Sequence, residues 1–264
     1  MSVQELESPG SLREKLAGMP MWSKHLIFAV VVFSSWELSA LKTDPIVWPP
    51  LRDVIKAFFS ILFDGSLITA LGQSLLLLVL GLSTACLSGL IIGIVVGRNK
   101  MLERMIVPFL GALYATPTIA LIPLLLVWFG FGLSGRVVVV WLIAFFPMVV
   151  SVHAGVRDTP KDLIEVARSF NVSKEWPLLK TVVLPSAVPM IMTGVRLSIG
   201  RGIVGMAVAE VYLRLGGIGA LISEYGAVFS TDYVLASIIS LPLLGILLTA
   251  AVGRLERRFQ HWRA

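Results

Sequence analysis

Residues 158–185 read DTPKDLIEVARSFNVSKEWPLLKTVVLP and form the longest polar interruption in the second half of a very apolar chain. The stretch has the features of a helix start. Thr159-Pro160 is followed by Asp162 and Glu165, and acidic side chains are favourable in the first turn of a helix. We therefore expect a short helix near the beginning of this segment.

The same segment contains a predicted helix break. We expect the first helix to run from Asp162 to Phe170 and to end at Asn171, because asparagine tolerates the left-handed conformation better than any residue except glycine. A second short helix should follow, and the chain should return to the membrane at Leu184-Pro185. The spacing alone is also typical of an ordinary solvated connection between two helices.

Composition indicates a membrane protein. The 264 residues are 56% hydrophobic and only 14% charged, and the mean hydropathy is +0.88. These values lie far from those of a soluble domain. The net charge of +6 does not indicate nucleic-acid binding, because the basic residues lie in short clusters beside apolar runs, where they set orientation. The single Cys86 cannot form an internal disulfide.

The apolar runs predict an all-α membrane protein with about six transmembrane helices. We expect a cytoplasmic tail over 1–23, a transmembrane domain over 24–258 that contains the cytoplasmic loop 158–180, and a cytoplasmic tail over 259–264. Lys and Arg gather in the segments predicted to lie inside, which places both termini in the cytoplasm. The predicted spans are 25–41, 67–97, 105–129, 137–156, 182–211 and 234–254. An amphipathic helix is expected in 42–66, and a short re-entrant or surface helix in 212–233.

Glycine and proline mark two of these spans. Gly89, Gly93 and Gly97 recur every four residues in the second span, which predicts close packing against another helix, within the subunit rather than between subunits. Three prolines should bend the third span. Tyr114 and Thr118 lie near the bends. The sequence is equally consistent with a packing role and with substrate contact for these two residues.

The polar loop resembles the cytoplasmic coupling loop of permease subunits in binding-protein-dependent ABC importers. That loop carries E-A-A, a Gly four residues after the second Ala, and a later Leu-Pro. Here Val replaces the first Ala and Asn replaces the Gly, which keeps the helix-breaking property. The resemblance implies that a groove on a separate ATPase receives the loop, with these coupling residues: Glu165, Val166, Ala167, Arg168, Phe170, Asn171, Leu184 and Pro185.

Further motifs extend the resemblance over roughly residues 45–258. They are Trp48-Pro49-Pro50, the run LLVWFGFG at 125–132, and Val208-Ala209-Glu210. They agree best with the branch that imports sulfonates, taurine, nitrate and related compounds. The resemblance implies a type I importer permease fold, a homodimer in a bacterial inner membrane in contact with lipid, two ATPase subunits that use the ATP, and a periplasmic or lipid-anchored substrate-binding protein.

Charged residues inside the fifth span are candidates for the translocation path. A buried charge costs about 2.5–3.5 kcal/mol at a span centre and usually faces the bundle interior or water. Arg196 and Arg201 lie about 140° apart around a helix, so they cannot share one narrow face. Both arginines either line the path for an anionic substrate or pair with carboxylates and helix ends to hold the bundle together. Glu210, further along the same helix, is a further candidate for the path.

Enzyme motifs are missing from the sequence. There is no G-x-x-x-x-G-K-[ST], H-E-x-x-H or G-x-S-x-G, and the three histidines are scattered, so we predict no catalytic residue, metal site or directly bound cofactor. The alternative function is a self-sufficient channel or ion-coupled carrier. A carrier usually needs buried carboxylates, of which this chain offers chiefly Glu210. Sulfonate, taurine, nitrate, an aromatic acid and a neutral precursor all remain possible substrates.

Overall fold

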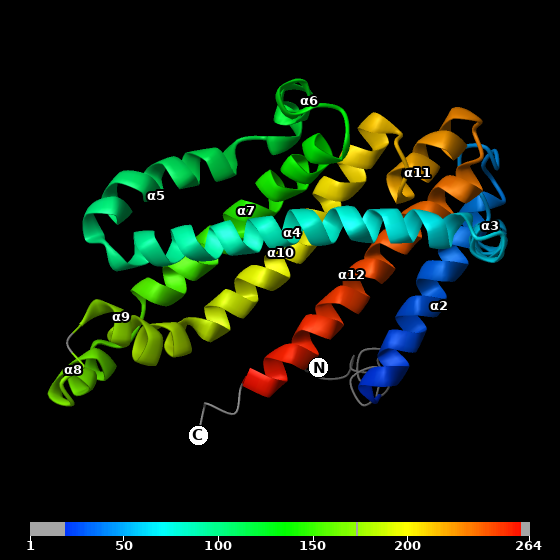
Figure 1. The fold of residues 1–264 in the computed structure, drawn as a ribbon. Coiled ribbons are helices and arrows are strands. Elements are labelled where there is room, and N and C mark those ends of the chain that lie inside the picture. Colours follow the sequence, from blue (N-terminus) through cyan, green and yellow to red (C-terminus); the bar gives the residue numbers. More distant parts are fainter. Residues whose placement is uncertain (1–18, 173, 260–264) are drawn as a thin grey trace, which may run out of the picture.

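A computed structural model describes residues 19–172 and 174–259, and all regular structure in this part of the chain is helical. Four long helices dominate the bundle (Figure 1): α4 (Ser66–Arg98), α7 (Leu133–Arg157), α10 (Leu184–Leu213) and α12 (Thr231–Phe259). α7 packs along both α4 and α10 and is the central helix. The apolar stretch of α7 is 61% buried, whereas those of the other long apolar helices are only 22–28% buried.

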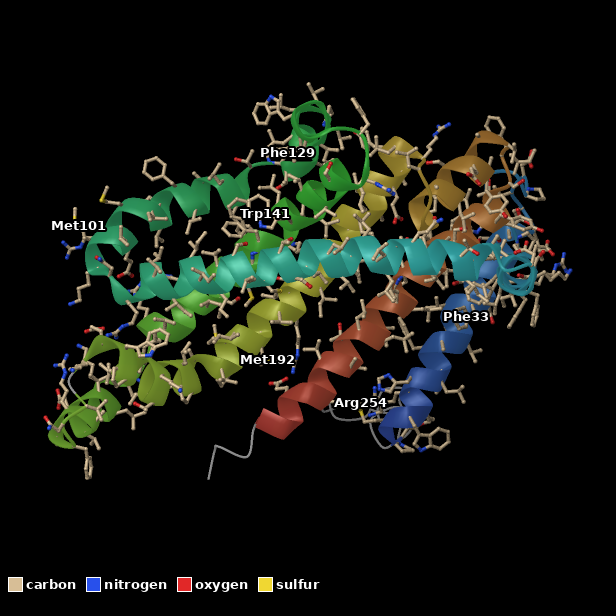
Figure 2. The ribbon with its side chains drawn as sticks, viewed as in Figure 1. Phe33, Met101, Phe129, Trp141, Met192 and Arg254 are labelled. Carbon is tan, nitrogen blue, oxygen red and sulfur yellow. The ribbon has the colours of Figure 1, made fainter. Side chains whose placement is uncertain are left out.

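Length and apolar composition mark four helical segments as membrane spans. They are Ser66–Arg98, Leu133–Arg157, Glu175–Leu213 and Thr231–Arg254. A broken helix pair, described below, makes a fifth span if its two arms are counted together. Apolar side chains are exposed on the outside of the bundle, among them Phe33 and Phe129 (Figure 2). The helical membrane fold predicted from the sequence is therefore confirmed.

The predicted third span is a sharply bent pair. α5 (Lys100–Ala115) and the segment Thr118–Phe129, made of a 3-10 turn (Thr118–Leu121) and α6 (Ile122–Phe129), meet at 86°. The break falls at Thr116-Pro117, where Thr116 has an extended backbone (ψ 136°). This is the conformation that a following proline favours. Pro108 lies within α5, and Pro123 lies in the first turn of α6, where its missing N–H is not needed.

The N-terminal helices join the bundle at the end opposite to α8 (Lys161–Ser169; Figure 1). α2 (Met21–Ala40) begins four residues before the predicted first span and is not among the helices marked as spans, so a sixth crossing stays a prediction. α3 (Leu51–Phe63) is the expected amphipathic helix and buries Val54, Ala57 and Ile61. The carboxylate of Glu37 in α2 holds the start of α3 by accepting a hydrogen bond from the Leu51 N–H at 2.9 Å.

The predicted glycine stripe packs against α7 in the same chain. A Cβ at Gly89, Gly93 or Gly97 would lie 2.8, 2.6 or 2.9 Å from a side-chain carbon of α7. Real Cβ atoms are not found at such distances, so glycine is required for the close approach. Gly81 extends the stripe by two turns and also faces α7. The prediction of packing within the subunit is confirmed.

The second half of the polar segment differs from the prediction. α9 (Glu175–Leu178) passes through a π-turn (Leu179–Val183) directly into α10. The predicted separate helix is therefore wrong, because the chain is helical from Glu175 to Leu213. Leu184-Pro185 begins α10 inside this continuous helix. The π-turn before Pro185 changes the helical register where the proline ring would otherwise meet the preceding turn.

Candidate functional site

The polar loop forms a short helix with a well-defined end. α8 spans Lys161–Ser169, within one residue of the prediction. Asn171 follows with a φ of 65°, in the left-handed region. The N–H of Val172 donates to the carbonyl of Ala167 at 3.0 Å, and the N–H of Asn171 donates to that of Arg168 at 2.9 Å. These two bonds are the Schellman pattern, and the predicted break is confirmed.

α8 leaves an apolar stripe uncovered. Leu163, Val166 and Phe170 lie three and four residues apart, so they share one face of the helix. Phe170 is 80% exposed, and the other two are about half exposed. Ile164 and Ala167, on another side of α8, are partly buried. A contiguous apolar patch rimmed by polar residues is typical of a protein interaction surface.

The structure brings most of the predicted coupling residues together. Glu165, Val166, Arg168, Phe170 and Asn171 are exposed on α8 and its C-terminal cap. Ala167 is partly buried and accepts the capping bond described above.

Leu184 and Pro185 lie elsewhere, in the first turn of α10. They adjoin Ser186, whose hydroxyl lies 3.3 Å from that of Thr159, just before α8. α8 is therefore linked to α10 as well as to α7.

Ion pairs link the surroundings of α8 to the rest of the bundle. Arg98, at the end of α4, pairs with Glu175 of α9. Arg157, at the end of α7, lies 3.1 Å from Glu103 of α5, and the buried His153 lies 3.3 Å from the same carboxylate. Sequence analysis assigned none of these pairs, because the partners are far apart in the chain. These pairs join α9 to α4 and α7 to α5, beside α8.

The two arginines of α10 have different surroundings. Arg196 pairs with Glu256 near the end of α12. Arg201 is exposed in the single subunit and forms no ion pair with the described part of the chain. It shares an uncovered face of α10 with Leu197 and Val204, which lie four residues before it and three residues after it.

The remaining candidates near the broken helix have local contacts. Tyr114 is partly exposed and lies against Phe146 of α7, with ring centroids 6.1 Å apart. The Thr118 hydroxyl donates to the Thr116 carbonyl at 3.3 Å, across the break between the two arms. The place of both residues on a translocation path stays a prediction.

Glu210 is fully buried in a polar cluster at the other end of α10. The Ser74 hydroxyl of α4 lies 2.8 and 2.9 Å from its two oxygens, and the Gly219 N–H donates to it at 3.0 Å. Gly219 lies in the first turn of α11 (Ile218–Ala227). The carboxylate thus caps α11 and joins it to α4 and α10. The place of Glu210 on a translocation path stays a prediction.

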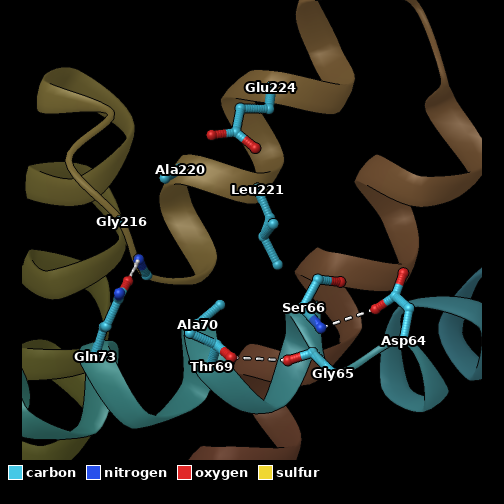
Figure 3. A pocket seen from close by; sticks show the side chains of 11 residues that line it. Asp64, Gly65, Ser66, Thr69, Ala70, Gln73, Gly216, Ala220, Leu221 and Glu224 are labelled. Atoms are coloured by element: carbon cyan, nitrogen blue, oxygen red, sulfur yellow. Dashed lines mark hydrogen bonds between the residues drawn. The ribbon is translucent and has the colours of Figure 1, made fainter.

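A cavity of about 450 Å³ adjoins this cluster (Figure 3). It lies between the start of α4 and α11, and Gln73 and Gly216 line it near the Glu210 cluster. Asp64 lies at its other edge and accepts the Ser66 N–H at 2.8 Å. Hydrogen bonds from the Ser66 side chain and backbone hold the pKa of the Asp64 carboxyl below its usual value. Within the described residues, no three His, Cys, Asp or Glu side chains gather as a metal site.

The fold and the exposed apolar stripe of α8 describe a multi-pass helical membrane protein with an uncovered surface at one end. Comparison with known families agrees. The family described as "Binding-protein-dependent transport system inner membrane component" matches residues 89–261. The chain belongs to this family of transport-system components.

Curated relatives point to the branch expected from the sequence. The putative aliphatic sulfonates transport permease SsuC of Bacillus subtilis is 32% identical over 244 residues, which cover 92% of this chain and 88% of the relative. The taurine transport permease TauC of Escherichia coli is 30% identical over 240 residues, 89% and 87% of the two chains. The resemblance to sulfonate- and taurine-type permeases is confirmed.

A solved structure supports the fold. The inward-facing MetNI methionine ABC transporter matches with a TM-score of 0.64 and 19% identity, over 75% of this chain and 97% of that chain. At this identity the likeness concerns the fold alone. The type I ABC importer permease fold is therefore confirmed.

Proposed function

We propose that the chain is the membrane-spanning subunit of an ATP-driven importer for a small anionic solute, of the sulfonate, taurine, nitrate or aromatic-acid kind. Two copies would enclose the path in a bacterial inner membrane. Two ATPase subunits would bind α8 from the cytoplasm, and a periplasmic or lipid-anchored binding protein would deliver the solute. The exposed apolar stripe of α8 is the observation that carries the proposal.

Docking of α8 has an evident energetic basis. Full burial of a Phe, Val or Leu side chain contributes about 1.5–3 kcal/mol, and three such side chains are uncovered on one face of α8. A groove on the ATPase that covers them would gain this free energy without reshaping the helix, because the Schellman cap already ends α8 at Asn171. A preformed helix loses little conformational entropy on binding.

Coupling follows from the contacts of α8. ATP-driven closure of the two ATPases would move the docked helices together. Thr159 and Ser186 link the start of α8 to α10, and Arg98 with Glu175 links α9 to α4. The motion would thus reach the long helices and switch the cavity between inward-open and outward-open. ATP shifts this two-state population only through its different affinity for the two states.

Arg201 is the proposed contact for an anionic solute. It lies within the longest apolar span and is exposed in the single subunit. A charged side chain facing lipid at that depth costs several kcal/mol. An uncovered arginine is therefore expected to face the water-filled path or a second copy. The names of the sulfonate and taurine relatives support an anionic head group in the solute.

An ion-coupled carrier has less support. Such a carrier needs a buried carboxylate that can exchange its ion with the path. Glu210 is fully buried, but its carboxylate already accepts hydrogen bonds from Ser74 and from the first turn of α11. Its hydrogen bonds hold three helices together, so releasing them in every cycle would expose buried polar groups at a cost of about 1–3 kcal/mol each.

Identification of co-purifying proteins tests the proposal. The full chain is tagged and gently extracted from its native membrane. We expect an ATPase with a phosphate-binding loop to accompany it, and Glu165→Ala on α8 to weaken that association. Glu224→Ala is the matched control, since Glu224 is exposed at the opposite end of the molecule. Isolation of the chain alone, with uptake still seen in vesicles without ATP, would support the carrier instead.

A further inference from the structure

A second cavity, of about 380 Å³, lies at the α8 end of the bundle. The turn between α4 and α5, the end of α7 and the start of α8 surround it (Figure 1). Arg98, Lys100, Arg104 and Arg157 line it, together with one carboxylate, Glu103. Four cations against one carboxylate leave the wall strongly positive. Such a wall favours an anion in the cavity.

Two of the four cations are available to a ligand. Arg157 is paired with Glu103, and Arg98 is paired with Glu175. Lys100 and Arg104 form no ion pair with any residue in the described ranges. They lie four residues apart in the first turns of α5, and therefore on one face. Both are exposed and border the cavity.

An apolar groove of about 300 Å³ adjoins the cationic cavity. Ile94, Val95, Leu179 and Trp176 line it together with the carboxylate of Glu175, and Arg98 belongs to both the groove and the cavity. Trp176 is 73% exposed. Met101, beside the same turn, is also exposed (Figure 2). The order along the surface is therefore a cationic cavity, Arg98, and an apolar groove with a tryptophan at its rim.

We propose that this double site binds one anionic phospholipid of the cytoplasmic leaflet. Lys100 and Arg104 hold the phosphate in the cavity, and Arg98 contacts it from the boundary, where Glu175 competes for the same guanidinium. An acyl chain lies in the groove along Ile94, Val95 and Leu179. Basic pockets between helices at the cytoplasmic surface suit such head groups, and tryptophan is favoured at the membrane interface.

The occupant follows from the combination of the two sites. A free phosphate ion would use the cavity and leave the groove empty, whereas a neutral lipid would use the groove and gain nothing from Lys100 and Arg104. Only a ligand with an anionic head and an apolar chain matches both. The choice of leaflet rests on the proposed orientation of α8 toward the cytoplasm, but the binding itself does not.

Lipid retention measures the binding without any transport assay. The full chain, with any subunit that co-purifies, is delipidated in mild detergent and titrated with phosphatidylglycerol or phosphatidylcholine in mixed micelles. Native mass spectrometry counts the bound lipids. We expect preferential retention of phosphatidylglycerol, and about thirtyfold weaker retention in Lys100→Gln/Arg104→Gln, since each basic residue near an anionic lipid contributes about fivefold.

A control variant and a measurement with inorganic phosphate distinguish lipid binding from the binding of a soluble anion. Lys42→Gln/Lys56→Gln removes two exposed charges at the opposite end and should retain phosphatidylglycerol like the unchanged chain. Equal retention of the two lipids by the unchanged chain overturns the proposal, even if the cavity variant fails to fold. Saturation of the cavity by inorganic phosphate at the same concentration, with no lipid preference, would assign it to a soluble anion. Loss of ATP-driven uptake alone bears on the importer function and not on this site.

Discussion

The Ser74 hydroxyl lies 2.8 Å from the carboxylate of Glu210, although 136 positions separate the two residues in the chain. Ser74 also accepts the Ile218 N–H at 2.9 Å. The Ser74 hydroxyl therefore bridges the Glu210 carboxylate and the first turn of α11. This contact lies at the end of the molecule far from the coupling helix (Figure 1).

Ser74→Ala should destabilise the subunit by about 1–3 kcal/mol, because a buried carboxylate and a buried N–H would each lose a partner. We expect a lower thermal unfolding midpoint in detergent. Ser223→Ala is the control, since its hydroxyl bonds a carbonyl in an exposed setting. Equal midpoints for the two variants would contradict the bridging role of Ser74.

Asn171→Val should uncouple ATP hydrolysis from solute uptake. A β-branched residue is strained at a φ of 65°, at a cost of roughly 1–2 kcal/mol, so the cap of α8 should open. The number of ATP molecules hydrolysed per solute imported is expected to rise in reconstituted vesicles. Asn171→Gly, which allows the same backbone, should keep the original ratio. A normal ratio in the valine variant would show that the cap does not transmit the motion.

Phe170→Ala should weaken the association with the ATPase. Phe170 is the most exposed apolar side chain of the α8 stripe, and loss of most of its buried area corresponds to about a tenfold to hundredfold weaker affinity. Titration of the purified permease with its ATPase measures this. Phe63→Ala, which removes an equally exposed ring at the other end, should leave the affinity unchanged.

Gly93→Ala should loosen the bundle. The added Cβ would lie 2.6 Å from the Cβ of Val152, where α4 and α7 approach each other closely. Overpacking of this kind typically costs about 1–3 kcal/mol. Gly72→Ala in the same helix meets nothing within 4 Å and should be neutral or stabilising by up to about 1 kcal/mol. The order of the two unfolding midpoints decides whether the stripe is a packing surface.

Arg201→Ala should abolish uptake of the anionic solute while the membrane level and the assembly with the ATPase stay normal. Arg201→Lys, which keeps the charge, should retain part of the uptake. Radiolabelled solute uptake and ATPase co-purification are measured on the same membranes. Normal uptake by the alanine variant would remove Arg201 from the proposed path.

Local sequence patterns predicted the main helices well. Apolar runs, the glycine stripe and the break at Asn171 depend on residues close in sequence, and each was found within a few positions of its expected place. The π-turn before Pro185 was not predicted, because Leu-Pro reads equally well as a helix start after a loop. The continuous helix depends on packing of Leu178 and Val183 against the bundle, both of which are buried.

Local sequence patterns could not predict the polar contacts between helices. Arg196 and Glu256, or Arg98 and Glu175, are too far apart in the chain for their spacing to signal a pair. The sequence held one signal for the polar cluster around Glu210. Gln73 and Ser74 are adjacent polar residues beside a run of leucines. Polar side chains inside a span usually face a partner. That observation indicates a contact, although it does not identify Glu210.

The left-handed residue at the end of α8 has a consequence for recognising related chains. What the proposed coupling loop requires at position 171 is a backbone conformation, and glycine is only one of the residues that adopt it. A motif search that demands glycine would pass over this chain, although its two capping bonds are intact. Aspartate shares the same tolerance. Permeases with Asn or Asp at this place therefore belong among the candidates for a functional coupling loop.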